Sequence, residues 1–286
     1  MQPILPYPGR AMRQIDVLHR GRAKVIACFE VDGFLIDPGP QSCEDALLTG
    51  LAGERPQALL LTHIHFDHAG AAGALVRRWP DLDVYVHERG APHMAKPERL
   101  VASAARLYGG EEGLRETWGE VIPVPEENLK VLSGGESVLG FQVAYTPGHA
   151  SHHVCYLHET SGWAFVGDMA GVRIPPWKLT LAPTPPPDID VDAWERSLDT
   201  IAAWEPAGLA LTHFGIAEDV PAQLDAVRDS LRWQAELAAE RDQEGFMTAL
   251  HDRIVHRARE DVAQFEQAAP LDHLFLGLDR WHRKRG

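Results

Sequence analysis

The chain has 286 residues, 45% of them hydrophobic and 24% charged, which is the composition of a folded globular protein. Its 27 Lys and Arg against 41 Asp and Glu give a formal net charge of −14 at pH 7, which argues against a protein that binds nucleic acid through a basic face. No apolar run approaches the ~20 residues of a membrane-spanning helix, and the first 14 residues lack the apolar segment of a secretory signal. Three cysteines without CxxC spacing indicate no disulfide framework. We therefore expect a cytoplasmic protein with neither a membrane nor a nucleic-acid partner.

Strand and helix patterns alternate through the first half of the chain. Residues 23–37 predict a β-hairpin, because two β-rich runs meet at Asp32-Gly33, a favoured two-residue turn. Ser42 is expected to cap a short helix that ends near Gly53. The elements expected next are a buried strand at 58–62, a helix at 68–79, a strand at 83–86 and a helical stretch at 97–118.

The second half continues the alternation. Strands are expected at 138–145, at 154–157 paired with 163–166, and at 209–212. The proline-rich residues 174–190 predict an ordered loop, and Asp190 is expected to cap the helix that follows it. Two amphipathic helices are expected over about 219–268. Strands and helices that alternate in this way indicate an α/β fold.

Histidines and aspartates come directly after four of the apolar strands. In chain order they are His63, His65, Asp67 and His68, then His149, then Asp168, then His213. Alternate side chains of an extended segment share a face, so His63 and His65 can reach one ion, whereas Asp67 and His68 lie at the turn into a helix and can serve a second. Each residue alone has a structural alternative, such as Asp67 capping its helix. Seven together behind apolar strands indicate a metal site, and imidazole and carboxylate ligands suit Zn, Mn or Fe.

These residues resemble a known set of motifs. The HxHxDH motif of the metallo-β-lactamase superfamily is matched by Thr62-His63-Ile64-His65-Phe66-Asp67-His68. The remaining metal-binding motifs of that family are resembled, in the same order, by Thr146-Pro147-Gly148-His149, Gly167-Asp168 and Thr212-His213. The resemblance covers about residues 23–215 and implies an αββα sandwich of two mixed β-sheets flanked by helices, with the metal site at one edge. We expect a single metallo-β-lactamase-like domain over 1–286, with a C-terminal helical extension packed on it at about 219–286.

Carried over residue by residue, the resemblance implies two divalent metal ions, with zinc favoured over manganese or iron. His63, His65 and His149 would bind the first ion, Asp67, His68 and His213 would bind the second, and Asp168 would bridge them. The family chemistry is hydrolysis by a metal-bound hydroxide, which Asp67 would orient while it passes a proton to the leaving group. Asp37 resembles an early aspartate of the family that would hold His65 or His68 in one tautomer.

The resemblance does not select one branch of the family. Aspartate at position 168, where some β-lactamases carry cysteine, favours the binuclear branches outside the lactamases. The metal motifs are similar to those of glyoxalase II, but 169–173 lack the glycine- and cysteine-containing segment of those enzymes, and 169–193 lack the tyrosine of many lactonases. The function expected is hydrolysis of an ester, thioester or lactone bond of a small molecule, in EC class 3.1. The alternatives are a phosphodiesterase or nuclease of the same fold and a mononuclear iron enzyme like the persulfide dioxygenases.

Specificity is expected to come from residues 87–130 and 173–190, which would flank the metal edge as a lid or substrate wall. The substrate candidates are Arg173 and Lys178 for an anionic group, Trp177 for an apolar group, and His152. Packing or solvation of the loop is the alternative for each. The apolar stripes of the C-terminal helices need a cover, which is either the surface of the chain itself or that of a second subunit in a homodimer.

Overall fold

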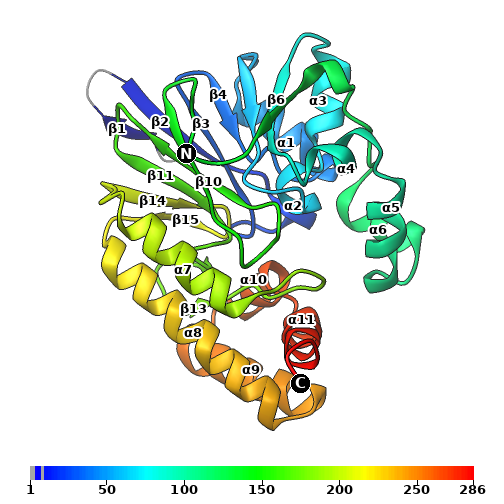
Figure 1. Ribbon diagram of the computed structural model, residues 1–286, viewed down its shortest axis with the longest axis vertical. Helices are drawn as coiled ribbons and strands as arrows, with labels where there is room; N and C mark the ends of the chain where they lie inside the picture. Colours follow the sequence, from blue (N-terminus) through cyan, green and yellow to red (C-terminus); the bar gives the residue numbers. More distant parts are fainter. Residues whose placement is uncertain (1–3, 8–9) are drawn as a thin grey trace. The chain divides into compact units, whose positions relative to one another are not determined.

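Two large β-sheets, each with helices of its own, and a small two-stranded sheet make up the described part of the chain (Figure 1). The computed structural model describes residues 4–7 and 10–286; residues 1–3 and 8–9, part of the stretch in which no secretory signal is expected, lie outside the described residues. The chain divides into a first unit, Met1–Ser137, and a second unit, Val138–Gly286. Within the described residues, no helix combines the length and the apolar character needed to cross a membrane.

The first unit contains a seven-stranded sheet whose strands follow chain order. They are β1 (Ile4–Tyr7), β2 (Arg10–Asp16), β3 (Ala27–Val31), β4 (Phe34–Ile36), β5 (Ala58–Leu60), β6 (Asp83–His87) and β7 (Leu129–Leu132). Strands β1 to β4 pair antiparallel, and β4 to β7 pair parallel, so the sheet is mixed. The β3–β4 hairpin turns at Asp32 and Gly33, both with positive φ, as the sequence predicts. Because β4 and β5 are parallel neighbours, the residues that follow them lie at one edge of the sheet.

The helices of the first unit are shorter than the sequence predicts. They are α1 (Glu44–Gly50), α2 (Phe66–Ala69), α3 (Ala72–Arg78), α4 (Ala91–Ala95), α5 (Glu98–Ala104) and α6 (Glu111–Trp118). The single helix expected at 68–79 was wrong, because the Ala71 amide leaves the helical pattern and donates to the Gly39 carbonyl at 2.9 Å. The helix expected at 97–118 is interrupted by Gly109 and Gly110, which both take positive φ.

The cap predicted for α1 was also wrong. Helix α1 begins at Glu44 after a 3-10 turn over Gln41–Cys43, so the N-cap position falls on Cys43 and no side chain caps the helix. The Ser42 hydroxyl donates instead to the Thr117 carbonyl at 3.0 Å. The Ser42 side chain thus binds Thr117, which is distant in the sequence, instead of capping the helix as its local sequence predicts.

The second unit contains a six-stranded mixed sheet in the order β15-β14-β11-β10-β9-β8. The strands are β8 (Ser137–Val138), β9 (Phe141–Tyr145), β10 (Val154–His158), β11 (Trp163–Gly167), β14 (Gly208–Leu211) and β15 (Gly215–Ala217), beside a small pair, β12 (Val172–Arg173) and β13 (Thr180–Leu181). The predicted hairpin of β10 and β11 is confirmed, whereas the strand expected at 138–145 breaks where Leu139 and Gly140 take positive φ. Strands β9, β11 and β14 run in one direction, so their carboxyl ends share an edge of the sheet.

Five helices complete the second unit. They are α7 (Val191–Ala202), α8 (Val220–Glu240), α9 (Gln243–Ala258), α10 (Val262–Ala268) and α11 (Leu271–Arg283). The predicted cap of α7 is confirmed, because the Asp190 side chain accepts from the Ala193 amide at 3.0 Å. The first of the two helices expected over 219–268 is α8, and the second breaks after Ala258 into α9 and α10, with Asp261 at the N-cap position of α10. Helix α11 lies beyond these two, within the helical extension expected at about 219–286. Helix α8 packs against α7, and α11 packs against α8 and α9 (Figure 1).

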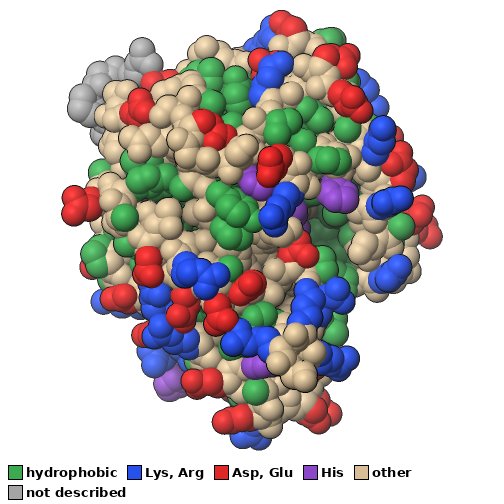
Figure 2. All heavy atoms as spheres, viewed as in Figure 1, with side chains coloured by type: hydrophobic (Ala, Val, Ile, Leu, Met, Phe, Trp, Pro, Cys, Tyr) green, Lys and Arg blue, Asp and Glu red, His purple; other side chains and the backbone are tan. Residues whose placement is uncertain are grey.

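Charged side chains of both signs are interspersed on the face of the molecule shown in Figure 2. Exposed pairs such as Arg228–Asp199 at 2.7 Å and Arg232–Glu195 at 2.6 Å link α8 to α7. Pairs of this kind contribute about 0–1 kcal/mol each. The packing of α8 on α7 therefore depends on the buried apolar side chains, among them Trp194 and Leu198 of α7 and Leu231 of α8.

Candidate metal centre

The histidine-rich segment of the first unit follows β5 and leads into α2. His63 is fully buried and lies in the extended segment before α2. His65 occupies the N-cap position of α2, and its backbone is also extended. His63 Nε2 lies 3.0 Å from His65 Nδ1, so the two imidazoles meet as the alternation of an extended segment predicts. Asp67 and His68 stand in the first turn of α2, where the His68 ring lies 3.9 Å from that of His63.

Asp37, which follows β4, joins this segment through three hydrogen bonds. Its carboxylate accepts from the Thr62 amide at 2.8 Å, from the Thr62 hydroxyl at 2.7 Å and from His68 Nδ1 at 2.8 Å. Asp37 is fully buried, so these donors replace the water that its carboxylate has lost. Of the two histidines expected as its partner, Asp37 binds His68, and it reaches His63 through Thr62.

These contacts fix the tautomers of two histidines. Because the Thr62 hydroxyl gives its proton to Asp37, it accepts from His63 Nδ1–H at 3.1 Å, which leaves Nε2 of His63 with a lone pair. His68 Nδ1 likewise donates to Asp37, and its Nε2 lies 3.8 Å from Oδ2 of Asp67. Two imidazole nitrogens and a carboxylate of the first unit are thus presented as lone-pair donors.

The second unit delivers His149 through a tight turn after β9. Gly148 has a φ of 142°, and a Cβ at this position would lie 2.3 Å from Cα of Trp194, so glycine alone fits. His149 itself is buried, and its Nδ1 donates to the Pro183 carbonyl at 2.8 Å. Its ring packs edge-on against Trp194, with ring centroids 5.4 Å apart. The His149 Nε2 atom is therefore the nitrogen that carries the lone pair.

Asp168 lies between two imidazoles of the second unit. It follows β11, and His213 follows the parallel neighbour β14, so the sheet brings them to one edge. Asp168 Oδ2 is 3.2 Å from His149 Nε2, and Oδ1 is 3.6 Å from His213 Nε2. All three side chains are buried. The Asp168 carboxylate thus faces an imidazole nitrogen with each of its two oxygens, and its role as a bridging ligand stays a prediction.

The donors of both units fit a divalent cation. An imidazole lone pair that faces a carboxylate oxygen, as in His149–Asp168 and His68–Asp67, is repelled unless a proton or a cation lies between them. Nitrogen and carboxylate oxygen donors without a thiolate suit Zn, Mn or Fe.

The substrate candidates make contacts of their own within the second unit. Arg173 of β12 donates through Nη1 to the Ile216 carbonyl, and burial lowers the pKa of this guanidinium. Trp177 Nε1 donates to Asp261 Oδ2 at 2.7 Å, Lys178 is exposed, and His152 is buried. Arg173 and Trp177 thus hold the loop together, and a contact of any of the four with substrate stays a prediction.

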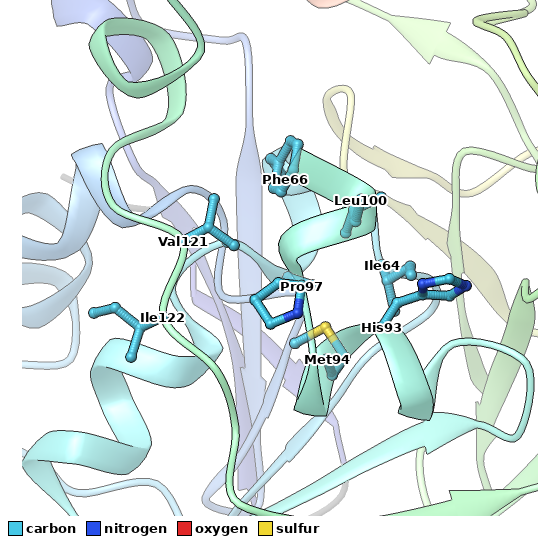
Figure 3. A pocket seen from close by; sticks show the side chains of 10 residues that line it. Ile64, Phe66, His93, Met94, Pro97, Leu100, Val121 and Ile122 are labelled. Atoms are coloured by element: carbon cyan, nitrogen blue, oxygen red, sulfur yellow. The ribbon is translucent and has the colours of Figure 1, made fainter. Parts of the chain in front are cut away.

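An apolar cavity of about 20 Å³ lies behind the histidine-rich segment in the first unit (Figure 3). Its lining side chains come from that segment and from the 87–130 insertion: Ile64, Phe66, Ala69, Gly70, His93, Met94, Pro97, Leu100, Val121 and Ile122. The volume accommodates about one water molecule, which is too small for a substrate group. The cavity shows that the insertion packs against the apolar side of the segment whose polar side chains are the predicted ligands.

Three supporting residues were not predicted from the sequence: Thr62, Pro183 and Gln234. Thr62 precedes His63 directly, and a hydroxyl residue between a strand and a candidate ligand is a feature of the sequence that could have indicated this supporting role. Pro183 acts through its backbone carbonyl, which no residue type reveals. Gln234 of α8 binds both backbone groups of Ala182 and lies far along the chain from His149.

Comparison with known proteins gives partial matches to curated relatives. The chain is 31% identical over 143 residues to a hydroxyacylglutathione hydrolase of Xanthomonas euvesicatoria pv. vesicatoria (strain 85-10), a match that covers 50% of this chain and 44% of that protein. It is 28% identical over 141 residues to the probable metallo-hydrolase YybB of Bacillus subtilis (strain 168), covering 48% of this chain and 57% of that one. The chain thus spans about half the length of the curated relatives it matches.

Solved structures share the fold. The metallo-beta-lactamase family protein TTHA1429 from Thermus thermophilus matches 99% of this chain and 91% of its own, with a TM-score of 0.62 and 23% identity. Together with the two mixed sheets and their helices, this likeness confirms the α/β metallo-β-lactamase fold with extra C-terminal helices. Residues 28–213 match the sequence model of the metallo-beta-lactamase superfamily, and the chain belongs to that superfamily.

Proposed function

We propose that this protein is a binuclear metallohydrolase that cleaves an ester, thioester or lactone bond of a small molecule. Membership of the superfamily supports metal-dependent hydrolysis, and the hydroxyacylglutathione hydrolase relatives support an acyl bond as the target. The observation that carries the proposal is that buried imidazole nitrogens face carboxylates in each unit, with tautomers that leave Nε2 of His63, His68 and His149 to act as ligands.

The ligands are assigned from the motifs. His63, His65 and His149 would hold one ion, Asp67, His68 and His213 would hold the other, and Asp168 would serve both. When bound, two divalent cations supply a water of lowered pKa, polarise the bond to be cleaved and stabilise the leaving oxygen or sulfur. Zinc is the ion that we propose, because its preference for imidazole with carboxylate matches this donor set.

The side chains of the protein orient the water and move its proton. Asp67, which is partly exposed, is the carboxylate to which the motif assigns this role: it would accept a proton from the attacking water and return it to the leaving group. Asp37, through His68 and Thr62, holds two of the imidazoles in the tautomer that binds a cation. His63 and Asp168 are buried, so bulk water is kept away from these two ligands.

The experiment is a parallel assay on one metal-loaded preparation. A lactone, a glutathione thioester, an aryl ester, a bis-aryl phosphate and, in the presence of oxygen, a glutathione persulfide are each tested with zinc, with manganese and with iron. Bound metal is measured by mass spectrometry. We expect turnover of an acyl substrate with two ions per chain. Turnover of the phosphate alone would establish a phosphodiesterase, and one iron per chain with persulfide oxidation would establish the mononuclear dioxygenase.

A pair of aspartate variants controls this assay. Asp168→Ala removes the proposed bridging ligand, so hydrolysis and bound metal are both expected to be lost. Asp199→Ala removes an exposed aspartate of α7 and is expected to keep both. Unchanged turnover in Asp168→Ala would overturn the proposal.

A further inference from the structure

The proline-rich loop, residues 174–190, is held by the C-terminal helices along most of its length. Asp261, which precedes α10, accepts from Trp177 Nε1, and the Leu274 carbonyl of α11 accepts from the Thr184 hydroxyl at 3.0 Å. Near the end of α11, Arg280 and Lys284 both donate to the Pro187 carbonyl, at 3.1 and 3.3 Å. The C-terminal helices therefore bind the proline-rich loop directly.

The same loop supplies the hydrogen-bond acceptor of His149. The Pro183 carbonyl accepts from His149 Nδ1 at 2.8 Å, and it stands between two residues that the helices hold directly, Ala182 and Thr184. A carbonyl at this position fixes both the tautomer and the orientation of the ring.

Gln234 of α8 makes the most specific contact with the loop. Its Oε1 accepts from the Ala182 amide at 3.0 Å, and its Nε2 donates to the Ala182 carbonyl at 2.8 Å, so one amide side chain pairs with both backbone groups of one residue. The Ser230 hydroxyl, one turn earlier on α8, donates to the same Oε1 at 2.8 Å and fixes the orientation of the Gln234 amide. Gln234 is fully buried, so no water can replace it.

Helix α11 packs closely against Thr184, the residue that follows Pro183 in the loop. A Cβ at Gly277 would lie 2.0 Å from the Thr184 carbonyl oxygen, so α11 approaches the loop at a distance that only glycine permits. His282 of α11 contacts the Ala235 carbonyl of α8 at 2.8 Å, which ties the two helices together beside the loop. The backbone on either side of Pro183 is thus held in place, with α8 binding Ala182 and α11 binding Thr184.

We propose that α8 and α11 support a metal ligand: Gln234 and Thr184 hold the Pro183 carbonyl in place, and that carbonyl orients His149 for metal binding. Gln234 is a positioning residue in this arrangement, because it acts on His149 through the loop. The proposal rests on the proposed function in one respect, namely that His149 binds a metal ion.

The test compares two glutamines of one helix. Gln234→Leu keeps the side-chain size and removes both hydrogen bonds to Ala182. Gln223→Leu is the matched control, since Gln223 is also buried on α8 and donates to the Ala170 carbonyl at 2.8 Å. Zinc affinity is measured by chelator competition, and the tautomer of His149 in the zinc-free protein by ¹⁵N NMR, with the His149→Ala spectrum as assignment.

We expect Gln234→Leu to weaken zinc binding by about 10–100-fold and to mix the His149 tautomers, whereas Gln223→Leu changes the affinity by less than about tenfold. A folded Gln234→Leu protein with the affinity and the tautomer of the unaltered chain would overturn the proposal. If Gln234→Leu does not fold, Thr184→Val, which loses only the bond to Leu274, is measured in the same way. Unchanged affinity and tautomer in that variant would also overturn it.

Different results would overturn the ligand assignment of His149 and the supporting role of α8 and α11. If His149→Ala keeps the zinc stoichiometry and affinity of the unaltered chain, then the ligand assignment of the proposed function is wrong. The tautomer measurement needs no metal, so it still decides whether α8 and α11 orient His149. If His149→Ala loses zinc while Gln234→Leu changes nothing, the ligand assignment stands and the supporting role is wrong.

Discussion

Asp37 accepts three hydrogen bonds with two carboxylate oxygens, and each donor bears on a predicted ligand. The bond from the Thr62 amide fixes the backbone beside His63, the bond from the Thr62 hydroxyl sets the His63 tautomer, and the bond from His68 sets its own. Because the carboxylate is fully buried, water cannot take its place. A single side chain therefore determines how two histidines present their nitrogens.

Asp37→Asn should weaken zinc binding by about 10–100-fold. The amide offers one acceptor oxygen where the carboxylate offers two, and its NH₂ group must face a donor, which drives His68 toward the Nε2–H tautomer and removes the lone pair. Chelator competition measures the affinity. Asp32→Asn makes the same change in the β3–β4 turn, where asparagine tolerates positive φ, and should bind zinc normally. Equal affinities in the two variants would contradict the role of Asp37.

At the scale of elements, the sequence predicts what local chemistry determines. The turn at Asp32-Gly33 and the cap at Asp190 were predicted because each acts within a few residues. The break between α2 and α3 was not, because the Gly39 carbonyl that captures the Ala71 amide is remote in the chain. The same distinction holds at the site: the candidate ligands follow strands and carry recognisable side chains, whereas the acceptor of His149 is a backbone carbonyl.

Gly148→Ala should destabilise the protein by more than a positive φ alone explains. Strain of this kind costs about 1–3 kcal/mol, and here a Cβ would also overlap the α7 backbone at Trp194. Gly135→Ala is the control, because Gly135 has a φ of 93° but open space around its Cβ position. Urea unfolding of the metal-free proteins gives both free energies. A loss in Gly148→Ala no larger than in Gly135→Ala would show that the close approach to Trp194 is unimportant.

At the scale of the whole molecule, the apolar faces of the C-terminal helices are buried by other parts of the same chain. The apolar side chains that form their stripes are fully buried within the chain: Val227, Leu231, Phe246, Leu250, Ile254, Phe265 and Leu278. The large hydrophobic side chains that are exposed among the described residues are scattered over four places: Leu18, Val131, Leu139 and Val255. A stable homodimer buries about 800 Å² per partner around an apolar centre, which scattered residues do not supply.

We therefore expect a monomer of 31.6 kDa at micromolar concentration. Light scattering coupled to gel filtration measures the mass directly, with and without zinc. A mass twice as large would show that a second copy binds through a surface other than the apolar stripes, and cross-linking would then locate it.

The support of His149 has a consequence for the order of events during synthesis. A nascent chain that has emerged as far as residue 215 carries all seven predicted donors, including His149, Asp168 and His213. Gln234 and Leu274, which hold the loop on either side of Pro183, have not yet emerged from the ribosome at that point. Tight metal binding at His149 would accordingly follow the folding of α11 rather than the appearance of the ligands. A ribosome-bound chain would thus hold an ion loosely at His149, and exchange it readily, until its last helix has folded.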